Sequence, residues 1–216
     1  MININQIKIP KIIIPLSILA ITLNILRVII WDKVSFVFIL WNIFLAFIPF
    51  VISSVLLFYS KEKKLNKILF IAGFILWLLF IPNAPYLITD FIHLGVIKSV
   101  PLIFDIILLF SSTLIGLILG FYSLFHIEQI IKIKYNKKTT SIIMGMIILL
   151  ISFGIYLGRY LRLNSWDVFV NHTSLIKNIL KIFSESANYT TVFLYTGLMF
   201  VSLLLFYKSF KYTNPK

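Results

Sequence analysis

The chain has 216 residues, of which 60% are hydrophobic and only 12% are charged, and its formal net charge is +13. A soluble domain of this size cannot bury so much apolar surface, so lipid is the expected solvent. The positive charges lie in short clusters between apolar runs, which is typical of a membrane protein and argues against nucleic acid as a partner. The absence of cysteine excludes disulfides and thiolate chemistry.

Six apolar segments predict an all-α, polytopic membrane protein, folded as a single membrane domain over residues 1–216. About 20 apolar residues are needed to cross a bilayer core of about 30 Å. The predicted spans are residues 12–30, 36–58, 67–82, 101–125, 141–161 and 191–207. The first follows two lysines and lacks a small-residue cleavage site, which predicts a retained signal anchor. The third is short before its proline, so it crosses with little tilt or continues into the polar stretch that follows.

The distribution of lysine and arginine predicts the orientation of these spans. One set of loops and ends is rich in lysine and holds only two acids, Glu62 and Glu128, whereas the other set holds the remaining five acids and all three arginines. Because positive residues favour the cytoplasmic side, we expect both termini in the cytoplasm and the protein in the plasma membrane. Two of the three histidines also fall on the outer side, so any chemistry is expected there.

The stretch PNAPYLITDFIHL, residues 82–94, is unusually polar for this chain. Pro85 suits the first turn of a helix and Asn83 suits its cap, so a short amphipathic helix is predicted over residues 85–94. The helical period places three polar side chains on one face, namely Tyr86, Asp90 and His93. The helix is too short to span, so it lies at the outer interface or in a re-entrant turn.

A second polar stretch, GRYLRLNSWD at residues 158–167, closes the fifth span and is expected on the same side. Asp105 stands in the first turn of the fourth span. Arg27 is expected to pair with an acid, since an intramembrane charge is expensive. An ion-paired cluster of these charges is therefore feasible, with the members Arg27, Asp90, Asp105, Arg159 and Arg162. A second amphipathic helix, predicted over residues 174–186, could lie on the outer leaflet as a lid.

These stretches resemble a family of bacterial multi-pass membrane proteins known as domain of unknown function 1361. The resemblance rests on PNAPYLITDFIHL, GRYLRLNSWD, Asp105 behind its proline and WNIFLAFIPF at residues 41–50, and it covers roughly residues 25–190. Leu163 stands where an aromatic residue is expected. The resemblance implies the multi-pass topology but no activity. The abundance of Ile, Lys and Asn is typical of a bacterium with AT-rich coding.

The candidate catalytic residues are Asp90, His93 and Asp167, because a carboxylate can orient a histidine that titrates near neutral pH. The candidate substrate-binding residues are Arg27, Asn83, Tyr86, Asp105, Arg159, Arg162, Asn164 and Trp166. The guanidinium group suits phosphate or carboxylate, so an anionic, lipid-linked or envelope substrate is expected besides the membrane lipids.

Other functions stay open at this point. Asp90 and His93 could bind a divalent metal together with Asp167 or His172, but no established metal motif is present, so no metal site is predicted. No cofactor or oligomeric state is assigned, and enzyme status is left open. A small transporter would use Asp105, Asp90 and Arg27 along a polar path, yet few polar residues lie deep in the spans and no repeat is visible. A non-catalytic assembly or scaffold protein is the third alternative.

Overall fold

The computed structural model describes residues 10–95, 99–170, 173, 177 and 189–213. It divides into two compact units, Met1–Ile130 and Ile131–Lys216. The helix expected over 174–186 and the candidate ligand His172 fall almost wholly outside the described residues. The expectation of one membrane domain stays a prediction.

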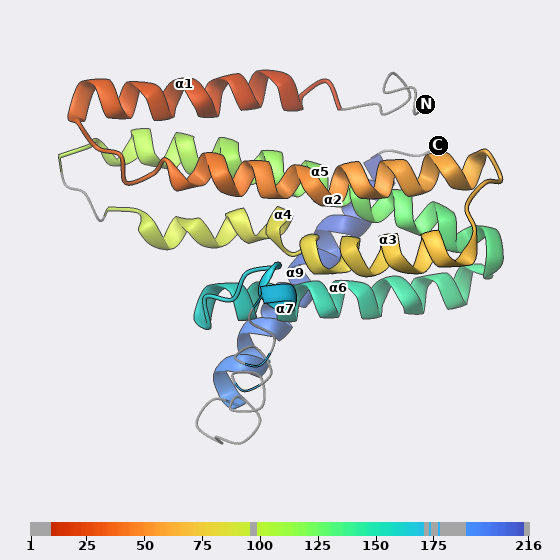
Figure 1. The fold of residues 1–216 in the computed structure, drawn as a ribbon. Helices are drawn as coiled ribbons and strands as arrows, with labels where there is room; N and C mark the ends of the chain where they lie inside the picture. Colours follow the sequence, from red (N-terminus) through yellow and green to blue (C-terminus); the bar gives the residue numbers. More distant parts are fainter. Residues whose placement is uncertain (1–9, 96–98, 171–172, 174–176, 178–188, 214–216) are drawn as a thin grey trace. The chain divides into compact units, whose positions relative to one another are not determined.

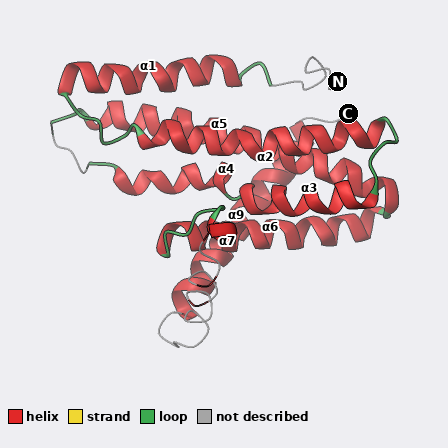
Figure 2. Ribbon diagram, in the orientation of Figure 1, coloured by secondary structure: helices red, strands yellow, loops and turns green. Residues whose placement is uncertain are grey.

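All regular secondary structure in the described part of the chain is helical (Figures 1 and 2). Among the described residues, six helical stretches are long and apolar enough to cross a membrane: Ile13–Trp31, Phe38–Lys61, Lys67–His93, Leu102–Lys134, Lys137–Tyr160 and Tyr189–Tyr212. The prediction of an all-α polytopic fold is therefore confirmed. One boundary differs, because α5 (Leu102–Lys134) runs well past the expected end at residue 125 and α6 begins at Lys137. The lysines expected in a loop lie mostly on helix ends.

The first unit contains α1 (Ile13–Trp31), α2 (Phe38–Lys61) and α3 (Lys67–Phe80), together with most of α5. α1 ends where Asp32 adopts a left-handed conformation, with φ of 51°. α3 begins at a polar cap, since the Leu69 N–H donates to Oδ1 of Asn66 at 2.8 Å. In Figure 1 the ribbons of α1, α2 and α3 run nearly parallel to one another within this unit.

The third span changes helix type at its prolines and continues as two further helices, α4 (Asn83–Tyr86) and the 3₁₀ helix η2 (Leu87–His93). Pro82 and Pro85 have no N–H, so the α-helical hydrogen-bond ladder loses donors here. The side-chain amide of Asn83 donates to the carbonyl oxygen of Phe80 at 2.9 Å. Asn83 therefore satisfies a carbonyl behind it, whereas the sequence predicted that it would cap the helix ahead.

The α4–η2 segment lies directly on α5. A Cβ atom added to Gly116 would collide with the carbonyl oxygen of Ala84, and one added to Gly120 would lie 3.2 Å from the Cβ of Ala84. The Thr113 hydroxyl donates to the carbonyl oxygen of Leu87 at 3.1 Å, which satisfies a backbone group of the irregular segment. The two glycines, Gly116 and Gly120, therefore allow α4 to approach α5 closely.

A buried hydrogen-bond relay joins α3, α5 and α2 in the first unit. The indole N–H of Trp77 donates to the Ser123 hydroxyl at 2.7 Å, and that hydroxyl donates to the carbonyl oxygen of Pro49 at 3.0 Å. Trp77 and Ser123 are both fully buried. The relay places polar partners between three helices where lipid offers none.

We expect Ser123→Ala to destabilise the protein by about 1–3 kcal/mol, because it leaves the buried indole N–H of Trp77 without its acceptor. The companion change Trp77→Phe together with Ser123→Ala removes both partners, so its additional cost beyond Trp77→Phe alone should be small. Thermal unfolding of the purified protein in nanodiscs measures both. A Ser123→Ala protein with unchanged stability would contradict the relay.

The second unit contains α6 (Lys137–Tyr160), the short α7 (Asp167–Val170) and α9 (Tyr189–Thr213). α6 begins at Asn136, whose side chain accepts from the Thr139 N–H at 2.9 Å. α6 and α9 pack together around Tyr156 and Val192. Aromatic contacts support this packing, since the Tyr195 ring of α9 meets the rings of Tyr156 and Tyr160 of α6 edge-on.

Candidate functional site

Asp90 and His93 lie on one line of the 3₁₀ helix η2. A 3₁₀ helix has three residues per turn, so residues three apart in sequence are eclipsed. Leu87, Asp90 and His93 therefore share a line, of which Leu87 and Asp90 are buried and His93 is partly exposed. Tyr86 lies one residue off this line, so the shared face predicted for an α-helix does not extend to it.

The carboxylate of Asp90 is held inside the first unit. Asp90 is only 1% exposed, and the side-chain amide of Asn42 on α2 donates to its Oδ2 atom at 3.0 Å. Burial of an ionised carboxylate is costly unless hydrogen bonds compensate for lost water. Asn42 supplies a donor that adds no charge, and it fixes the direction in which the carboxylate points.

His93 is held by an aromatic contact between η2 and α2, one turn of η2 beyond Asp90. Its ring meets the Phe38 ring edge-on, with centroids 5.3 Å apart. Phe38 and Asn42 are four residues apart on α2, so they occupy one face of it. That face therefore presents an aromatic ring to His93 and an amide to Asp90. The imidazole is partly exposed and positioned, while the carboxylate behind it is enclosed.

Arg27 and Asp105 form a buried ion pair between α1 and α5. Nε of Arg27 lies 2.9 Å from Oδ1 of Asp105, and Nη2 lies 3.3 Å from Oδ2, so the contact is bidentate. Each residue is 1% exposed. Bidentate geometry gives a guanidinium–carboxylate pair its strength and its fixed orientation.

The remaining contacts of Arg27 close the pair off. Its Nη1 atom donates to the Ser35 hydroxyl at 2.7 Å and to the carbonyl oxygen of Lys33 at 3.2 Å. The guanidinium carbon also lies 4.1 Å from the centroid of the Phe36 ring. A guanidinium has about five N–H donors, and four hydrogen bonds are already made within the protein. The pair fastens the segment between α1 and α2 to α5.

In the second unit, the polar stretch after α6 forms a capped turn. The Asp167 carboxylate accepts from the backbone N–H of Asn164 at 2.6 Å, and the Asp167 N–H donates back to the Asn164 carbonyl at 3.0 Å. These two hydrogen bonds close the turn from Asn164 to Asp167 that leads into α7. Arg162 is exposed, and its backbone adopts the left-handed conformation, with φ of 54°, where the chain leaves α6. Arg159 and Trp166 are partly buried.

The predicted site residues thus fall into three local groups: Asp90 with His93, Arg27 with Asp105, and Asn164 with Asp167. The joint cluster of five charges stays a prediction, because its members belong to different units. Over residues 10–95, 99–170 and 189–213, no group of three or more His, Cys, Asp or Glu side chains stands close enough to hold a metal ion.

Sequence reasoning did not identify which side chains contact Asp90, His93 and Arg27. Asn42 and Phe38 touch Asp90 and His93 from α2, and Ser35 binds Arg27. An asparagine inside an apolar span is a signal that it has a buried polar partner, but the partner cannot be read from spacing. His126 was also overlooked, because the lysines that follow it indicated a loop.

The fold is that of an all-α, polytopic membrane protein, in which Asp90 is buried and His93 is partly exposed on η2. The chain belongs to the family described as Protein of unknown function (DUF1361), which matches residues 41–204. This match confirms the resemblance and includes Asn42, Asp90, His93 and Asp105. No curated protein and no solved structure matches the chain.

Proposed function

We propose that the protein binds or processes a lipid-linked or envelope substrate at the outer face of the plasma membrane, with Asp90 and His93 as the working groups. One observation carries this proposal: a fully buried carboxylate, fixed by Asn42, lies one 3₁₀ turn from a partly exposed imidazole. Ionisable groups inside a membrane are expensive and are retained mainly where they have a function.

The chemistry of these two groups suits acid–base work. A neutral imidazole can accept a proton at one nitrogen and donate one at the other near neutral pH. His93 would meet the ligand, and Asp90 would stabilise its charged form from inside the bundle. Membrane lipids or lipid-linked intermediates can approach such a residue laterally, so they are the partners proposed here.

The other candidate residues take different parts in this proposal. Arg27 and Asp105 are assigned to structure, because their polar atoms are engaged with each other and with Ser35. Asp167 is proposed chiefly as a cap, although its catalytic role stays open as a prediction. Four residues of the second unit remain proposed contacts for an anionic group, namely Arg159, Arg162, Asn164 and Trp166.

Native mass spectrometry of the protein extracted with its lipids tests the proposal. We expect a retained lipid-linked species on the wild type, and a loss of at least about tenfold on His93→Gln, which corresponds to about 1.4 kcal/mol of binding free energy. Ile92→Ala is the matched control, since Ile92 lies next to His93 on the exposed side of η2. Equal retention by all three proteins would contradict the proposed ligand site.

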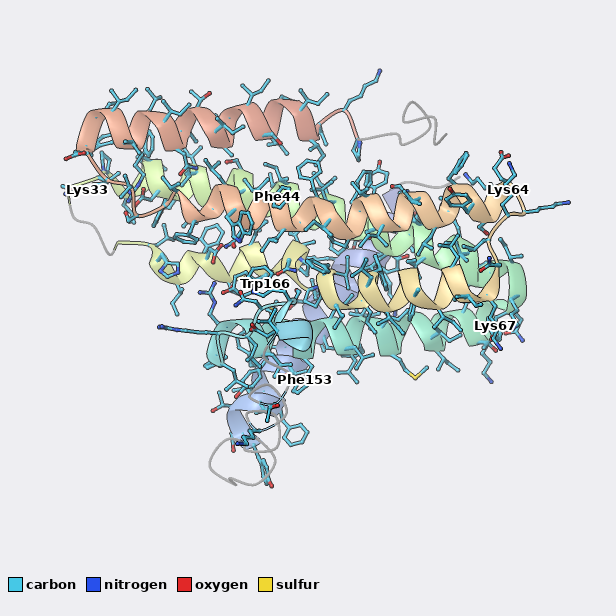
Figure 3. The ribbon with its side chains drawn as sticks, in the orientation of Figure 1. Lys33, Phe44, Lys64, Lys67, Phe153 and Trp166 are labelled. Atoms are coloured by element: carbon cyan, nitrogen blue, oxygen red, sulfur yellow. The ribbon has the colours of Figure 1, made fainter. Side chains whose placement is uncertain are left out.

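The orientation gives a further prediction. Lys33 marks one end of α2, and Lys64 marks the opposite end (Figure 3). We propose that the Lys64 end is cytoplasmic, together with both termini. Because the chain has no cysteine, Val34→Cys and Lys64→Cys each introduce a single thiol. In intact cells a membrane-impermeant maleimide should label only Val34→Cys, and labelling of Lys64→Cys should require permeabilisation. The reverse pattern would invert the proposed topology.

A non-catalytic assembly protein is the second candidate function, and the enclosed Arg27–Asp105 pair is the observation that favours it. Under this alternative the polar side chains only join helices. His93→Gln would then lower thermal stability without any change in the lipids retained by the folded protein.

A further inference from the structure

The turn between α2 and α3 carries a cluster of positive charge that includes none of the candidate site residues. Four lysines and one glutamate stand close together there and leave a net charge of +3: Lys61, Lys63, Lys64, Lys67 and Glu62. All five are exposed. Lys64 lies 3.7 Å from Glu62, and the other three lysines have no ion-pair partner among the residues that the structure describes. Figure 3 shows Lys64 and Lys67 at the same end of α2 and α3.

The backbone of this turn is fixed by hydrogen bonds. The N–H of Lys64 donates to the carbonyl oxygen of Tyr59 at 2.9 Å, and the N–H of Lys63 donates to that of Ser60 at 3.1 Å. These two bonds form the Schellman motif that commonly ends an α-helix. Lys63 occupies its left-handed position, with φ of 56°, where glycine is usual because a side chain disfavours that conformation. A lysine at this position therefore adds positive charge at a conformational cost.

The start of α3 shows a second placement that local energetics disfavour. Lys67 is the first residue of α3 and follows the cap residue Asn66. The helix dipole favours acids and disfavours cations in a first turn, yet the first turn of α3 holds no acid. Two lysines of the cluster thus stand where the protein itself does not favour them, and an external anion would offset both costs.

Exposed hydrocarbon side chains begin directly beside the lysines. Ile68 follows Lys67 and is 80% exposed, and Ile71 on the next turn is 45% exposed. α2 has 24 residues, which corresponds to about 36 Å at about 1.5 Å per residue, so it is long enough to bring Lys61 to the headgroups of a bilayer with a core of about 30 Å. A ligand that covers this surface needs an anionic end for the lysines and a hydrocarbon end for α3.

We propose that this lysine cluster binds the phosphate group of an anionic phospholipid, with an acyl chain against Ile68 and Ile71. Phosphatidylglycerol fits the surface, since no headgroup amine neutralises its phosphate. The ammonium groups would donate charge-assisted hydrogen bonds to the phosphate oxygens. The cluster is separate from the site of the proposed function, because Lys61 lies about 28 Å from Asn42 along the axis of α2, at about 1.5 Å per residue.

Photo-crosslinking in nanodiscs with equal amounts of phosphatidylglycerol and phosphatidylcholine tests the proposal. A photoreactive residue in place of Ile71 captures lipid beside the cluster, and one in place of Ile103, which is 63% exposed, is the control. We expect phosphatidylglycerol to be enriched at least about fivefold at position 71, the factor for one cation near an anionic surface, and not at position 103. Equal capture of the two lipids at position 71 would overturn the proposal. Both faces of a nanodisc present the same lipids, so the result does not depend on the proposed orientation.

Three variants separate the role of charge from that of structure. The triple change Lys61→Gln, Lys63→Gln and Lys67→Gln should abolish the enrichment at position 71. Lys63→Gly removes one charge and relieves the left-handed strain, so it should lower the enrichment while the melting temperature stays the same or rises. Lys33→Gln removes a lysine at the opposite end of α2 and should leave the enrichment unchanged. An enrichment that survives the triple change, or a Lys63→Gly protein with full enrichment, would contradict the proposal.

Added salts distinguish a lipid headgroup from a free anion. Sodium chloride should lower the enrichment, because salt screens exposed charges. Inorganic phosphate at the same ionic strength should lower it no further, and a stronger effect of phosphate would assign the cluster to a soluble anion and overturn the lipid assignment. His93→Gln should leave the enrichment unchanged, so this proposal and the proposed function can fail separately.

Discussion

Replacing Asp105 by alanine should lower the free energy of unfolding by about 3–5 kcal/mol, because it leaves the buried charge of Arg27 without its counterion. The guanidinium is 1% exposed and is bound on three sides, by Asp105, Ser35 and the carbonyl of Lys33. Because the guanidinium is buried, water cannot replace Asp105 as its partner. Thermal unfolding in nanodiscs and the yield of folded protein after extraction both measure this loss.

The paired variant Arg27→Met with Asp105→Leu removes both charges and should recover most of the stability lost in Asp105→Ala, because apolar replacement of a buried ion pair is often neutral. Lys64→Ala is the matched control at the surface. Lys64 lies 3.7 Å from Glu62 in an exposed ion pair, so its loss should cost less than about 1 kcal/mol. If Asp105→Ala were as stable as Lys64→Ala, the pair would not fasten α1 to α5.

Gly116→Ala should destabilise the protein by about 1–3 kcal/mol and displace the segment that carries Asp90 and His93. The new Cβ would meet the carbonyl oxygen of Ala84 and the side chain of Leu87. A backbone oxygen cannot rotate away, so α4 must shift relative to α5. We also expect the NMR chemical shifts of the His93 imidazole to change, because its contact with Phe38 depends on the position of η2.

Gly145→Ala is the control for this prediction. A Cβ at Gly145 meets nothing within 4 Å, so the change adds only helix propensity, which favours alanine by up to about 1 kcal/mol. Gly145→Ala should therefore be neutral or slightly stabilising, and the NMR chemical shifts of the His93 imidazole should stay unchanged. A neutral Gly116→Ala with an unmoved His93 signal would show that the close approach of α4 to α5 is not needed.

The number and type of helices could be predicted from the sequence, because apolar runs of sufficient length have few alternatives in lipid. The buried partner of Arg27 was also foreseeable in kind, since a charge in a span needs an acid. The identity of that acid could not be predicted, because Arg27 and Asp105 are far apart in the chain and meet only through the packing of α1 on α5.

The local geometry of the site could not be predicted in the same way. Hydropathy distinguishes helix from loop, but it does not distinguish a 3₁₀ helix from an α-helix over a few residues, so Tyr86 was placed on the wrong line relative to Asp90. The contact between Asn42 and Asp90 depends on the register of α2 against η2. Lysines at the end of α5 were interpreted as a loop, which concealed the hydrogen-bond contacts of His126 with two serines of α2.

Photo-crosslinking beside His93 is the most direct test of the central claim that Asp90 and His93 form a ligand site. A photoreactive residue in place of Ile92 reports the neighbourhood of His93, and one in place of Ile103, which is 63% exposed on the first turn of α5, reports the lipid at a second exposed position. The account predicts a lipid-linked or envelope species captured at position 92, absent at position 103 and lost in His93→Gln. Capture of the same bulk phospholipids at both positions, with no effect of His93→Gln, would contradict it.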